Sequence, residues 1–348
     1  MLGRDRISNL LNDILSKAVE MKASDVHIEP FDEYAVIRMR VDGELIKIME
    51  IDEVDYLELT TVIKLSASMD IAEKRLPQDG RTDISVEEKS IDIRVSTMPT
   101  IYGEKVVLRI LERNSFLKKK RELGLTNEAM EVVDSMLEKK YGLILVTGAT
   151  GSGKTTTVYS MLSELKDESK NIMTIENPVE YKMEGVNQIQ VNQKIGLTFE
   201  TGLRSILRQD PDIIMVGEIR DSETAKIAIR AAITGHLVIS TLHTSDAASA
   251  IIRLVEMGIE PYLIRASIIG VISQKLVKKR VNKSKYAGRT AIFEIIMLGE
   301  KLKSYIDQTC DLATLRNKAM DEGMITFESC LKNLIVDNEI EISEEPRR

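Results

Sequence analysis

The sequence predicts an α/β fold in which a mostly parallel sheet with helices on both faces follows a small α+β unit. Two features of the apolar pattern lead to this prediction. From Leu125 onward, short continuous apolar runs alternate with amphipathic helical stretches, which is typical of buried parallel strands joined by helices. Before that point, strand-like runs with alternating apolar and polar residues lie between helical stretches, which indicates a half-open antiparallel sheet.

The overall composition is that of a globular protein with enough apolar material for a core. The 348 residues are 43% hydrophobic and 30% charged. The 55 acidic residues outnumber the 48 basic ones, which gives a net charge of −7. Aromatic residues make up only 4%, and Trp is absent. Both features argue against a general nucleic-acid binder, so we expect no nucleic-acid partner.

The chain contains only two cysteines, Cys310 and Cys330. Two thiols cannot build a disulfide framework or a four-cysteine zinc site, so we expect reduced thiols in the cytosol and no zinc. The first residues carry no apolar signal region, and no stretch approaches the roughly 18 apolar residues that span a bilayer. The longest run, Ile264 to Ile272, is short and contains Arg265. We therefore expect a soluble, cytoplasmic protein that can still dock onto a membrane protein.

The first unit, residues 1–112, is predicted to contain two helices and six short strands. Apolar residues at helical spacing indicate helices over Ile7–Met21 and Val54–Ser68. Strand-like runs cover residues 26–28, 36–41, 45–48, 82–86, 91–96 and 106–111. The dipeptide Asp42-Gly43, between the second and third of these runs, is typical of a hairpin turn.

A charged linker is predicted over residues 113–124. It contains Lys118-Lys119-Lys120-Arg121, which favours a solvated connection over the alternative of a phosphate- or lipid-binding segment. In the second unit, residues 125–348, strand-like runs cover 142–147, 171–176, 212–216 and 237–241. Helical stretches follow them over 155–165, 199–207, 222–233 and 247–257. From Glu260 onward we expect a mostly helical part with one strand-like run, Arg289–Ile296.

The strongest chemical signal is the run GATGSGKT, which begins at Gly148 between a predicted buried strand and a predicted helix. It fits the phosphate-loop pattern, in which glycines let backbone amides approach phosphate oxygens closely. Lys154 is expected to reach the β- and γ-phosphates of a nucleotide, and Thr155 to coordinate Mg²⁺. The predicted nucleotide-binding residues are Gly148, Thr150, Gly151, Ser152, Gly153, Lys154, Thr155 and Thr156.

Acidic residues follow two further strands of the predicted sheet. Glu218 comes after the strand over 212–216, where nucleotide hydrolases place the acid that binds Mg²⁺ or orients water, although Gly217 stands where an aspartate is common. Glu176 and Glu180 lie at the end of the preceding strand and just beyond it. Because the carboxyl ends of parallel strands face the ligand crevice, both glutamates are candidates to polarise the attacking water.

Two histidines and two arginines complete the candidate set. His236 and His243 lie at the two ends of the strand over 237–241. A histidine near a γ-phosphate can sense its charge, whereas an isolated histidine is commonly structural. Arg81 and Arg94 lie in or beside strands of the first unit. Arginine suits a clamp on phosphate, but sequence spacing alone leaves a surface ion pair open.

Together, these motifs resemble one family, the secretion-type ATPases of type II secretion and type IV pilus assembly. The resemblance extends from about Ser24 to about Glu294 and takes in several stretches in a fixed order. They are SDVHIEP at 24–30, LPQDGR at 76–81, RVSTMPT at 94–100, the phosphate loop, the aspartate box at 176–180, GEIRD at 217–221, and the histidine box from 234–236 to 242–244.

The resemblance implies a PAS-like first domain and a RecA-like motor domain, assembled as a homo-hexameric ring. Glu180 is implied to activate water, and Glu218 to support Mg²⁺ beside ATP. Arg81 and Arg94 are implied to contact the phosphates from the first domain. ATP hydrolysis is then expected to power assembly of a type IV pilus, a type II secretion pseudopilus or a competence pilus. The motor is expected to act through an inner-membrane platform protein, to which it attaches from the cytoplasm.

The sequence departs from the family at Asn177, which stands where the aspartate box carries an aspartate, and it lacks the four-cysteine zinc module of many assembly ATPases. Residues 76–81 and 94–100 look more similar to the assembly and secretion branch than to retraction motors. Two alternatives stay open. One is a RecA-like nucleic-acid translocase, which the acidic balance disfavours, and the other is an ATP-gated scaffold with little hydrolysis, which Asn177 alone favours.

Overall fold

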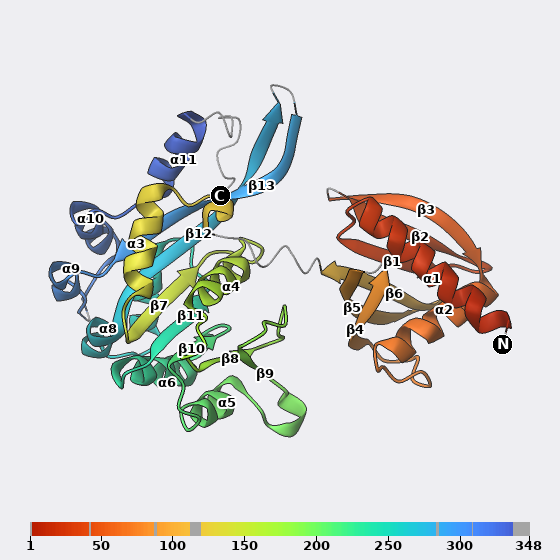
Figure 1. The fold of residues 1–348 in the computed structure, drawn as a ribbon, viewed down its shortest axis with the longest axis horizontal. Coiled ribbons are helices and arrows are strands. Elements are labelled where there is room, and N and C mark those ends of the chain that lie inside the picture. Colours follow the sequence, from red (N-terminus) through yellow and green to blue (C-terminus); the bar gives the residue numbers. More distant parts are fainter. Residues whose placement is uncertain are drawn as a thin grey trace. The chain divides into compact units, whose positions relative to one another are not determined.

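The computed structural model describes residues 2–41, 43–86, 89–111, 120–282, 285–307 and 309–336. The chain divides into two compact units, Met1–Ser115 and Phe116–Arg348, each with its own hydrophobic core (Figure 1). No helix within the described residues is long and apolar enough to cross a membrane. The predicted fold class is confirmed, since an antiparallel α+β unit precedes a mostly parallel α/β unit.

The first unit is a six-stranded antiparallel sheet covered on one face by two helices. Its strands are β1 (Asp25–Pro30), β2 (Tyr34–Val41), β3 (Glu44–Asp52), β4 (Gln78–Val86), β5 (Lys89–Thr100) and β6 (Gly103–Leu111), in the order β3-β2-β1-β6-β5-β4. Apolar residues of α1 (Leu2–Glu20) and α2 (Glu53–Ser66) pack into one core with this sheet. Val26 of β1 points into that core, whereas its neighbours Asp25 and His27 lie on the other face.

A buried ion pair ties α2 to β6. The Lys64 ammonium group lies 2.9 and 3.0 Å from the two carboxylate oxygens of Glu104, and only 1% and 5% of these side chains are exposed. Lys64 also donates to the backbone carbonyl of Glu73, and the Tyr56 hydroxyl bonds the backbone of Glu104. The pair therefore joins the helix, the strand and the loop before β4 at one point.

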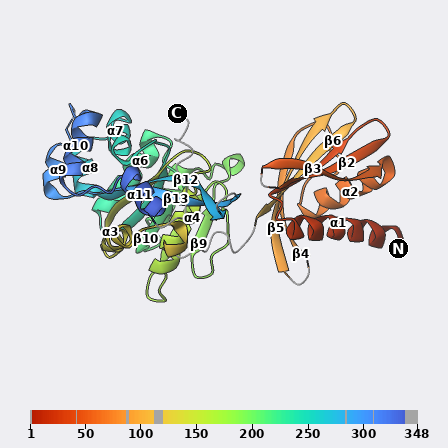
Figure 2. The same cartoon turned by 90° about the horizontal axis from the view of Figure 1, so that it is seen from above.

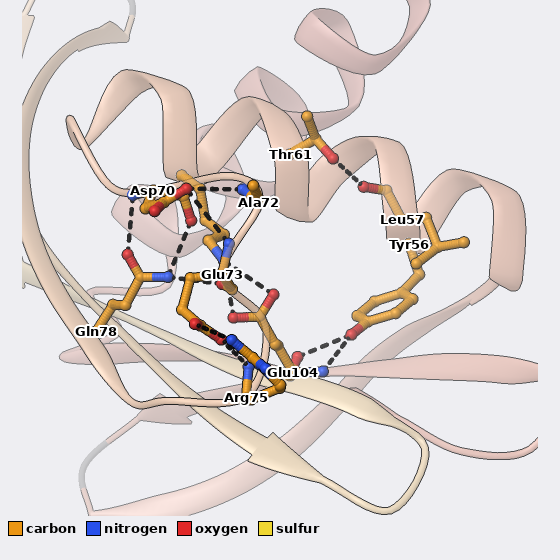
Figure 3. Close-up of polar contacts among 10 residues, drawn as sticks. Tyr56, Leu57, Thr61, Asp70, Ala72, Glu73, Arg75, Gln78 and Glu104 are labelled. Atoms are coloured by element: carbon orange, nitrogen blue, oxygen red, sulfur yellow. Dashed lines mark hydrogen bonds and ion pairs between the residues drawn. The ribbon is translucent and has the colours of Figure 1, made fainter.

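The loop between α2 and β4 closes on itself through side-chain hydrogen bonds (Figure 3). Asp70 accepts from the amides of Ala72 and Glu73. Gln78 bonds the backbone of Asp70 and of Glu73. Hydrogen bonds from Arg75 to the Glu73 carboxylate lower the pKa of Glu73 to about 2. These contacts fix the start of β4, the strand that carries the first candidate arginine.

The second unit is a seven-stranded sheet that is parallel except at one edge. Its strands are β7 (Gly142–Thr147), β8 (Ile172–Glu176), β9 (Asn187–Gln190), β10 (Ile213–Val216), β11 (Leu237–Leu242), β12 (Ile268–Asn282) and β13 (Lys285–Met297). They lie in the order β13-β12-β7-β11-β10-β8-β9, with β13 antiparallel to β12. The helices are α3 (Asn127–Leu137), α4 (Lys154–Leu165), α5 (Phe199–Ile206), α6 (Ser222–Ile233), α7 (Ala247–Glu256), α8 (Pro261–Ser267), α9 (Glu300–Ser304), α10 (Leu312–Asp321) and α11 (Phe327–Val336).

Helices cover both faces of this sheet (Figure 2). Leu143 and Leu145 of β7 belong to a core with residues of α6 and α7. Ile144 and Val146 belong to a core with residues of α3 and α4. Every residue of β7 is buried, because both of its faces are covered. This explains why the strand appears in the sequence as a continuous apolar run.

The part after Glu260 differs from the sequence-based expectation. It contains the helices α8 to α11 and the expected strand, which lies within β13, but the expectation of a single strand is wrong, because the 15-residue strand β12 precedes β13. The apolar start of β12 pairs with β7 on one side and β13 on the other, and Val271 and Ile272 are completely buried. Periodicity cannot separate such an unbroken run from a buried helix, which is the reason for the error.

The linker expected over residues 113–124 is described from Lys120 onward. Residues Lys120–Leu123 form a short 3₁₀ helix that belongs to the second unit. The Lys120 side chain is only 10% exposed, and it pairs with Asp134 of α3 and with Glu164 of α4, which is 2.8 Å away. The end of the charge run is therefore held against the second unit, and its first part lies outside the described residues.

Lys64→Met should lower the free energy of unfolding by about 3 kcal/mol, because it leaves the Glu104 carboxylate buried without its cation. Urea denaturation of the whole chain, followed by far-UV circular dichroism, measures this change. Lys47→Met is the matched control, since Lys47 pairs with Glu50 on the exposed surface and should contribute less than about 1 kcal/mol. Equal effects of the two substitutions would contradict a special role for the buried pair.

Candidate functional site

Parallel pairing brings the ends of four strands to one edge of the sheet. Thr147, the last residue of β7, lies opposite Leu242 of β11. Val216, the last residue of β10, lies opposite Ile175 of β8, and β10 also pairs with β11. The segments that follow these strands therefore share the carboxyl edge, where α/β sheets bind ligands. This edge carries the phosphate loop, Glu176, Glu218 and His243.

The phosphate loop connects β7 to α4 in a conformation that its glycines permit. Gly148 and Gly153 have φ angles of 145° and 88°, in a region that other residues rarely adopt. A Cβ atom on Gly148 would collide with the backbone carbonyl of Gln274 in β12. Gly153 is the N-cap of α4, so the first backbone amides of that helix, from Lys154 onward, face the loop.

Lys154 lies against this loop and is 8% exposed. Its Nζ atom donates to the carbonyls of Gly148 at 2.8 Å and Ala149 at 2.9 Å. Burial lowers the pKa of Lys154, and the nearby Glu218 carboxylate acts in the opposite direction. The buried Ser152 hydroxyl has no hydrogen-bond partner within the described residues. A cation, an unused hydroxyl and a loop of backbone amides suit an anion such as a phosphate.

Gln274 of β12 supports this loop, and sequence reasoning missed it. Its side-chain oxygen accepts from the Thr157 hydroxyl at 2.6 Å, and both residues are buried. Its side-chain nitrogen lies against Gly153, where an added Cβ would be 2.8 Å away. β12 therefore holds both the phosphate loop and the first turn of α4. Because this stretch was expected to be helical, no sequence signal connected Gln274 with the loop.

Glu176 is held in a buried network of hydrogen bonds. Its carboxylate accepts from the hydroxyls of Tyr159 at 2.5 Å and Thr174 at 2.6 Å, and from the side-chain amide of Gln188 at 3.2 Å. Burial raises the pKa of Tyr159, and the Glu176 charge raises it further, so the phenol stays protonated and donates. With its oxygens engaged in this way, Glu176 fits a positioning role better than that of a water-activating base.

The segment after β8 carries the second candidate glutamate. Glu180 is half-buried, and Asn177, the departure from the family pattern, is exposed. The amide of Tyr181 lies 3.4 Å from the Tyr159 hydroxyl, the group that also donates to Glu176. One side chain of α4 therefore connects Glu176 to the segment that contains Glu180.

Glu218 follows β10 and lies among basic groups. One carboxylate oxygen lies 2.6 Å from a guanidinium nitrogen of Arg220, and the other lies 3.5 Å from Nε2 of His243. Only 13% of the Glu218 side chain is exposed. Gly217 precedes it and packs closely against β8, since a Cβ atom there would lie 3.2 Å from the Cα atom of Glu176. A side chain at position 217 would therefore require β8 to shift by a few tenths of an ångström.

The two candidate histidines lie at opposite edges of the sheet. His243 follows β11 beside Glu218. His236 precedes β11, and its backbone carbonyl accepts from the amide of Gly142, where β7 begins. Its Nδ1 atom lies 2.9 Å from the carbonyl of Ala231 at the end of α6. Six strand residues at about 3.3 Å each separate the two positions, so His236 does not join the other candidates within this chain.

The candidate arginines belong to a cross-strand row in the first unit. Arg81 of β4 lies opposite Arg94 of β5, which in turn lies opposite Arg109 of β6. Arg81 binds both oxygens of Asp92, with its Nε atom at 2.8 Å. The Nε atom of Arg109 lies 2.9 Å from a carboxylate oxygen of Asp25. Strand register, which sequence spacing does not reveal, places Arg109 beside the two predicted arginines on one face.

The oxygen donors at the carboxyl edge of the second unit fit Mg²⁺ bound together with a nucleotide. Thr155 follows Lys154 at the start of α4, and Glu218 follows β10 at the same carboxyl edge of the sheet. Mg²⁺ commonly takes one or two protein oxygens and completes its shell with phosphate oxygens and water. Within the described residues, no group of three or more His, Cys, Asp or Glu side chains could hold a metal ion.

Comparison with known proteins identifies the family. The family model described as "Type II/IV secretion system protein" matches residues 2–344. The chain is 45% identical over 337 residues to the type II secretion system protein HxcR of Pseudomonas aeruginosa, covering 91% of this chain and 72% of that protein. It is 51% identical over 272 residues to the type II secretion system protein E of Pectobacterium carotovorum subsp. carotovorum, covering 78% of this chain and 55% of that protein. The chain belongs to this family, and the predicted membership is confirmed.

Solved structures support the same fold. The pilus retraction motor PilT with bound ADP matches with a TM-score of 0.71 and 28% identity, over 92% of this chain and 96% of that one. The ATPase DotB of Legionella pneumophila matches with a TM-score of 0.76 and 24% identity, over 96% of this chain and 93% of that one. Both matches extend over almost the whole chain, which confirms the predicted fold class with its RecA-like motor domain.

Tyr159→Phe should lower the free energy of unfolding by about 1–3 kcal/mol, because a buried oxygen of Glu176 loses its donor. Urea denaturation measures the loss. The exposed Tyr262 of α8 provides the matched control, and Tyr262→Phe should leave the free energy of unfolding unchanged. Wild-type stability of the Tyr159 variant would show that this network contributes nothing to the fold.

Proposed function

We propose that this chain is an ATP-hydrolysing motor that works as a homo-hexamer and powers assembly of a type IV pilus or a type II secretion pseudopilus. The carboxyl edge of the second unit carries this proposal, because the phosphate loop, Lys154 and Glu218 all lie there. Membership of the type II/IV secretion family supports it, as does the likeness to a pilus motor with bound ADP.

In this proposal the phosphate loop binds the triphosphate through its backbone amides. Lys154 neutralises charge on the β- and γ-phosphates, which grows as the terminal phosphoryl group is transferred. Thr155 and Glu218 would hold Mg²⁺, which adds positive charge beside the phosphate oxygens when bound. Arg220 and His243 keep the Glu218 carboxylate in place through the contacts described above.

Glu180 is the proposed water-activating residue. A general base needs an oxygen that can accept a proton from water, and the three donors around Glu176 leave that residue poorly suited. Glu176 instead fixes Tyr159, which in turn bonds the backbone of the segment that carries Glu180. Asn177 directly follows Glu176 in the sequence, and its side chain is exposed.

Ring assembly is proposed to complete the site with arginines. As the family resemblance implies, Arg81 and Arg94 of the first unit would contact the phosphates in the assembled ring. Asp92 and Asp25 fix the side chains of Arg81 and Arg109, the flanking members of the arginine row. Preorganised guanidinium groups cost less conformational entropy when they bind.

The similarity to type II secretion system proteins supports our proposal for the branch and the partner of the motor. They share 45% and 51% identity with this chain, against 28% for the retraction motor, which favours the assembly and secretion branch. We therefore infer a cytoplasmic motor that attaches to the inner membrane through a platform protein. The net charge of −7 supports a protein partner rather than a nucleic acid.

Glu180→Gln should still bind ATP but should lower kcat by about 100-fold or more, because it removes the general base. A fluorescent ATP analogue measures binding, and release of inorganic phosphate measures turnover. Glu184→Gln is the matched control, since Glu184 is an exposed glutamate of the same segment, and its kinetics should match the wild type. Normal turnover by the Glu180 variant would transfer the role to Glu176.

Specific ATPase activity should rise with protein concentration, because neighbouring copies complete the site. Hydrolysis is measured on the purified chain over a wide concentration range, and Lys154→Ala, which should abolish turnover, controls for contaminating ATPases. Activity that stays constant while sizing shows monomers would contradict the ring. Tight ATP binding without hydrolysis would favour the ATP-gated scaffold, and stimulation by DNA would favour the translocase.

A further inference from the structure

A fully buried carboxylate that the proposed chemistry does not use lies near the carboxyl edge. Glu294 of β13 has 0% of its surface exposed. One of its oxygens accepts from the amide of Ala247, the first residue of α7, at 3.0 Å. Arg316 of α10 donates to both oxygens, at 3.2 and 2.9 Å. Glu294 therefore joins one strand and two helices at a single point.

Strand register connects this point to the candidate site. Glu294 lies opposite Ser273 of β12, and Ser273 lies opposite Thr147, the last residue before the phosphate loop. Thr147 lies opposite Leu242, the residue before His243. Glu294 is thus in one cross-strand row with the ends of the two strands that lead into the phosphate loop and into His243.

The connection between β11 and α7 is short, since it consists of residues 243–246 only. Its last residue, Asp246, caps α7 by accepting from the amide of Ser249 at 2.8 Å. Burial opposes ionisation of Asp246, but hydrogen bonds from Ser249 and the charge of Arg316 lower its pKa. The Arg316 charge therefore acts on both carboxylates at the start of α7. A short connection that is fixed at this end leaves His243 little freedom to move.

We propose that Arg316 and Glu294 are positioning residues that anchor the start of α7 and thereby hold His243 beside Glu218. The kinetic part of this proposal rests on the proposed function, because it requires measurable ATP turnover. The pair also connects α10, in the C-terminal helical part, to the carboxyl edge of the sheet. A displacement of α10 is therefore transmitted to the site through one ion pair.

The energetics of a buried charge make the anchor effective. Without Arg316, the Glu294 carboxylate keeps a single described hydrogen bond, from the first amide of α7. A buried carboxylate that loses its cation is costly, so the start of α7 and the residues before it shift to admit water. The contact between His243 and Glu218 is 3.5 Å long already, and a further shift of about one ångström breaks it.

Hydrogen exchange of the whole chain, read by mass spectrometry, tests the anchor without any ATP. In Arg316→Gln the amides of residues 243–249 should exchange about tenfold faster than in the wild type. The amides of β7, the strand that precedes the phosphate loop, should stay protected. Arg253→Gln is the matched control, because Arg253 is on α7 too but pairs with Glu256 at the exposed surface. Unchanged exchange over 243–249 would overturn the proposal.

Steady-state kinetics test the consequence for turnover. Arg316→Gln should lower kcat about tenfold with the KM for ATP within about twofold, and Arg316→Lys should recover part of the loss. On a His243→Ala background, Arg316→Gln should lower kcat no further, since its effect passes through His243. The positioning role would be overturned if the two substitutions together lowered kcat by the product of their separate effects. It would also be overturned if Arg316→Gln exchanged faster over residues 243–249 but kept the wild-type kcat.

Folding and function are separated by two further measurements. If Arg316→Gln exchanges fast everywhere and is unfolded, Glu294→Ala replaces it, because that variant removes both the acceptor of the Ala247 amide and the partner of Arg316 without leaving an unpaired buried carboxylate. Its faster exchange should again be confined to residues 243–249, and exchange as slow as in the wild type would overturn the proposal. A wild type without ATP turnover would refute the proposed function, whereas the exchange result would still decide on the anchor.

Discussion

The parallel pairing of β7 with β11 on one side and β12 on the other is the constraint on which the second unit depends. It sets the register that puts Thr147 level with Leu242 and Ser273. Gly148 of the phosphate loop, His243 and Gln274 are the next residues after these three positions. Backbone hydrogen bonds between the strands therefore determine where they lie relative to one another. Side-chain chemistry then acts on a scaffold whose geometry two continuous apolar cores maintain on either face.

The sequence predicted those elements whose pattern of residues lies within one short segment of the chain. β7 and α6 have the bounds that the apolar pattern indicated, and the glycine-rich run forms the expected loop between a strand and a helix. The features of the site that the sequence did not reveal all depend on how segments distant in sequence pair or pack together. Tyr159 meets Glu176, Gln274 meets Thr157, and Arg109 joins the arginine row only because their elements pack together. β12 escaped prediction because an apolar run buried on both sides carries no period of its own.

Three buried carboxylates show how the fold accommodates charge. Glu104 is paired with Lys64, Glu176 accepts from neutral donors, and Glu294 combines Arg316 with the start of a helix. Each solution ties together elements that are far apart in sequence. Such contacts contribute little net stability compared with apolar packing, but they tolerate few alternative geometries. The buried carboxylates therefore fix contacts between particular strands and helices, in addition to the apolar packing around them.

The 15 residues of β12 connect three parts of the second unit. Its first residues pair with β7, Gln274 touches the phosphate loop, and the remainder continues as an antiparallel ribbon with β13 (Figure 1). The phosphate loop and the ribbon are therefore connected by one continuous strand, so the position of Gln274 beside the loop and the pairing of β12 with β13 are set by the same backbone.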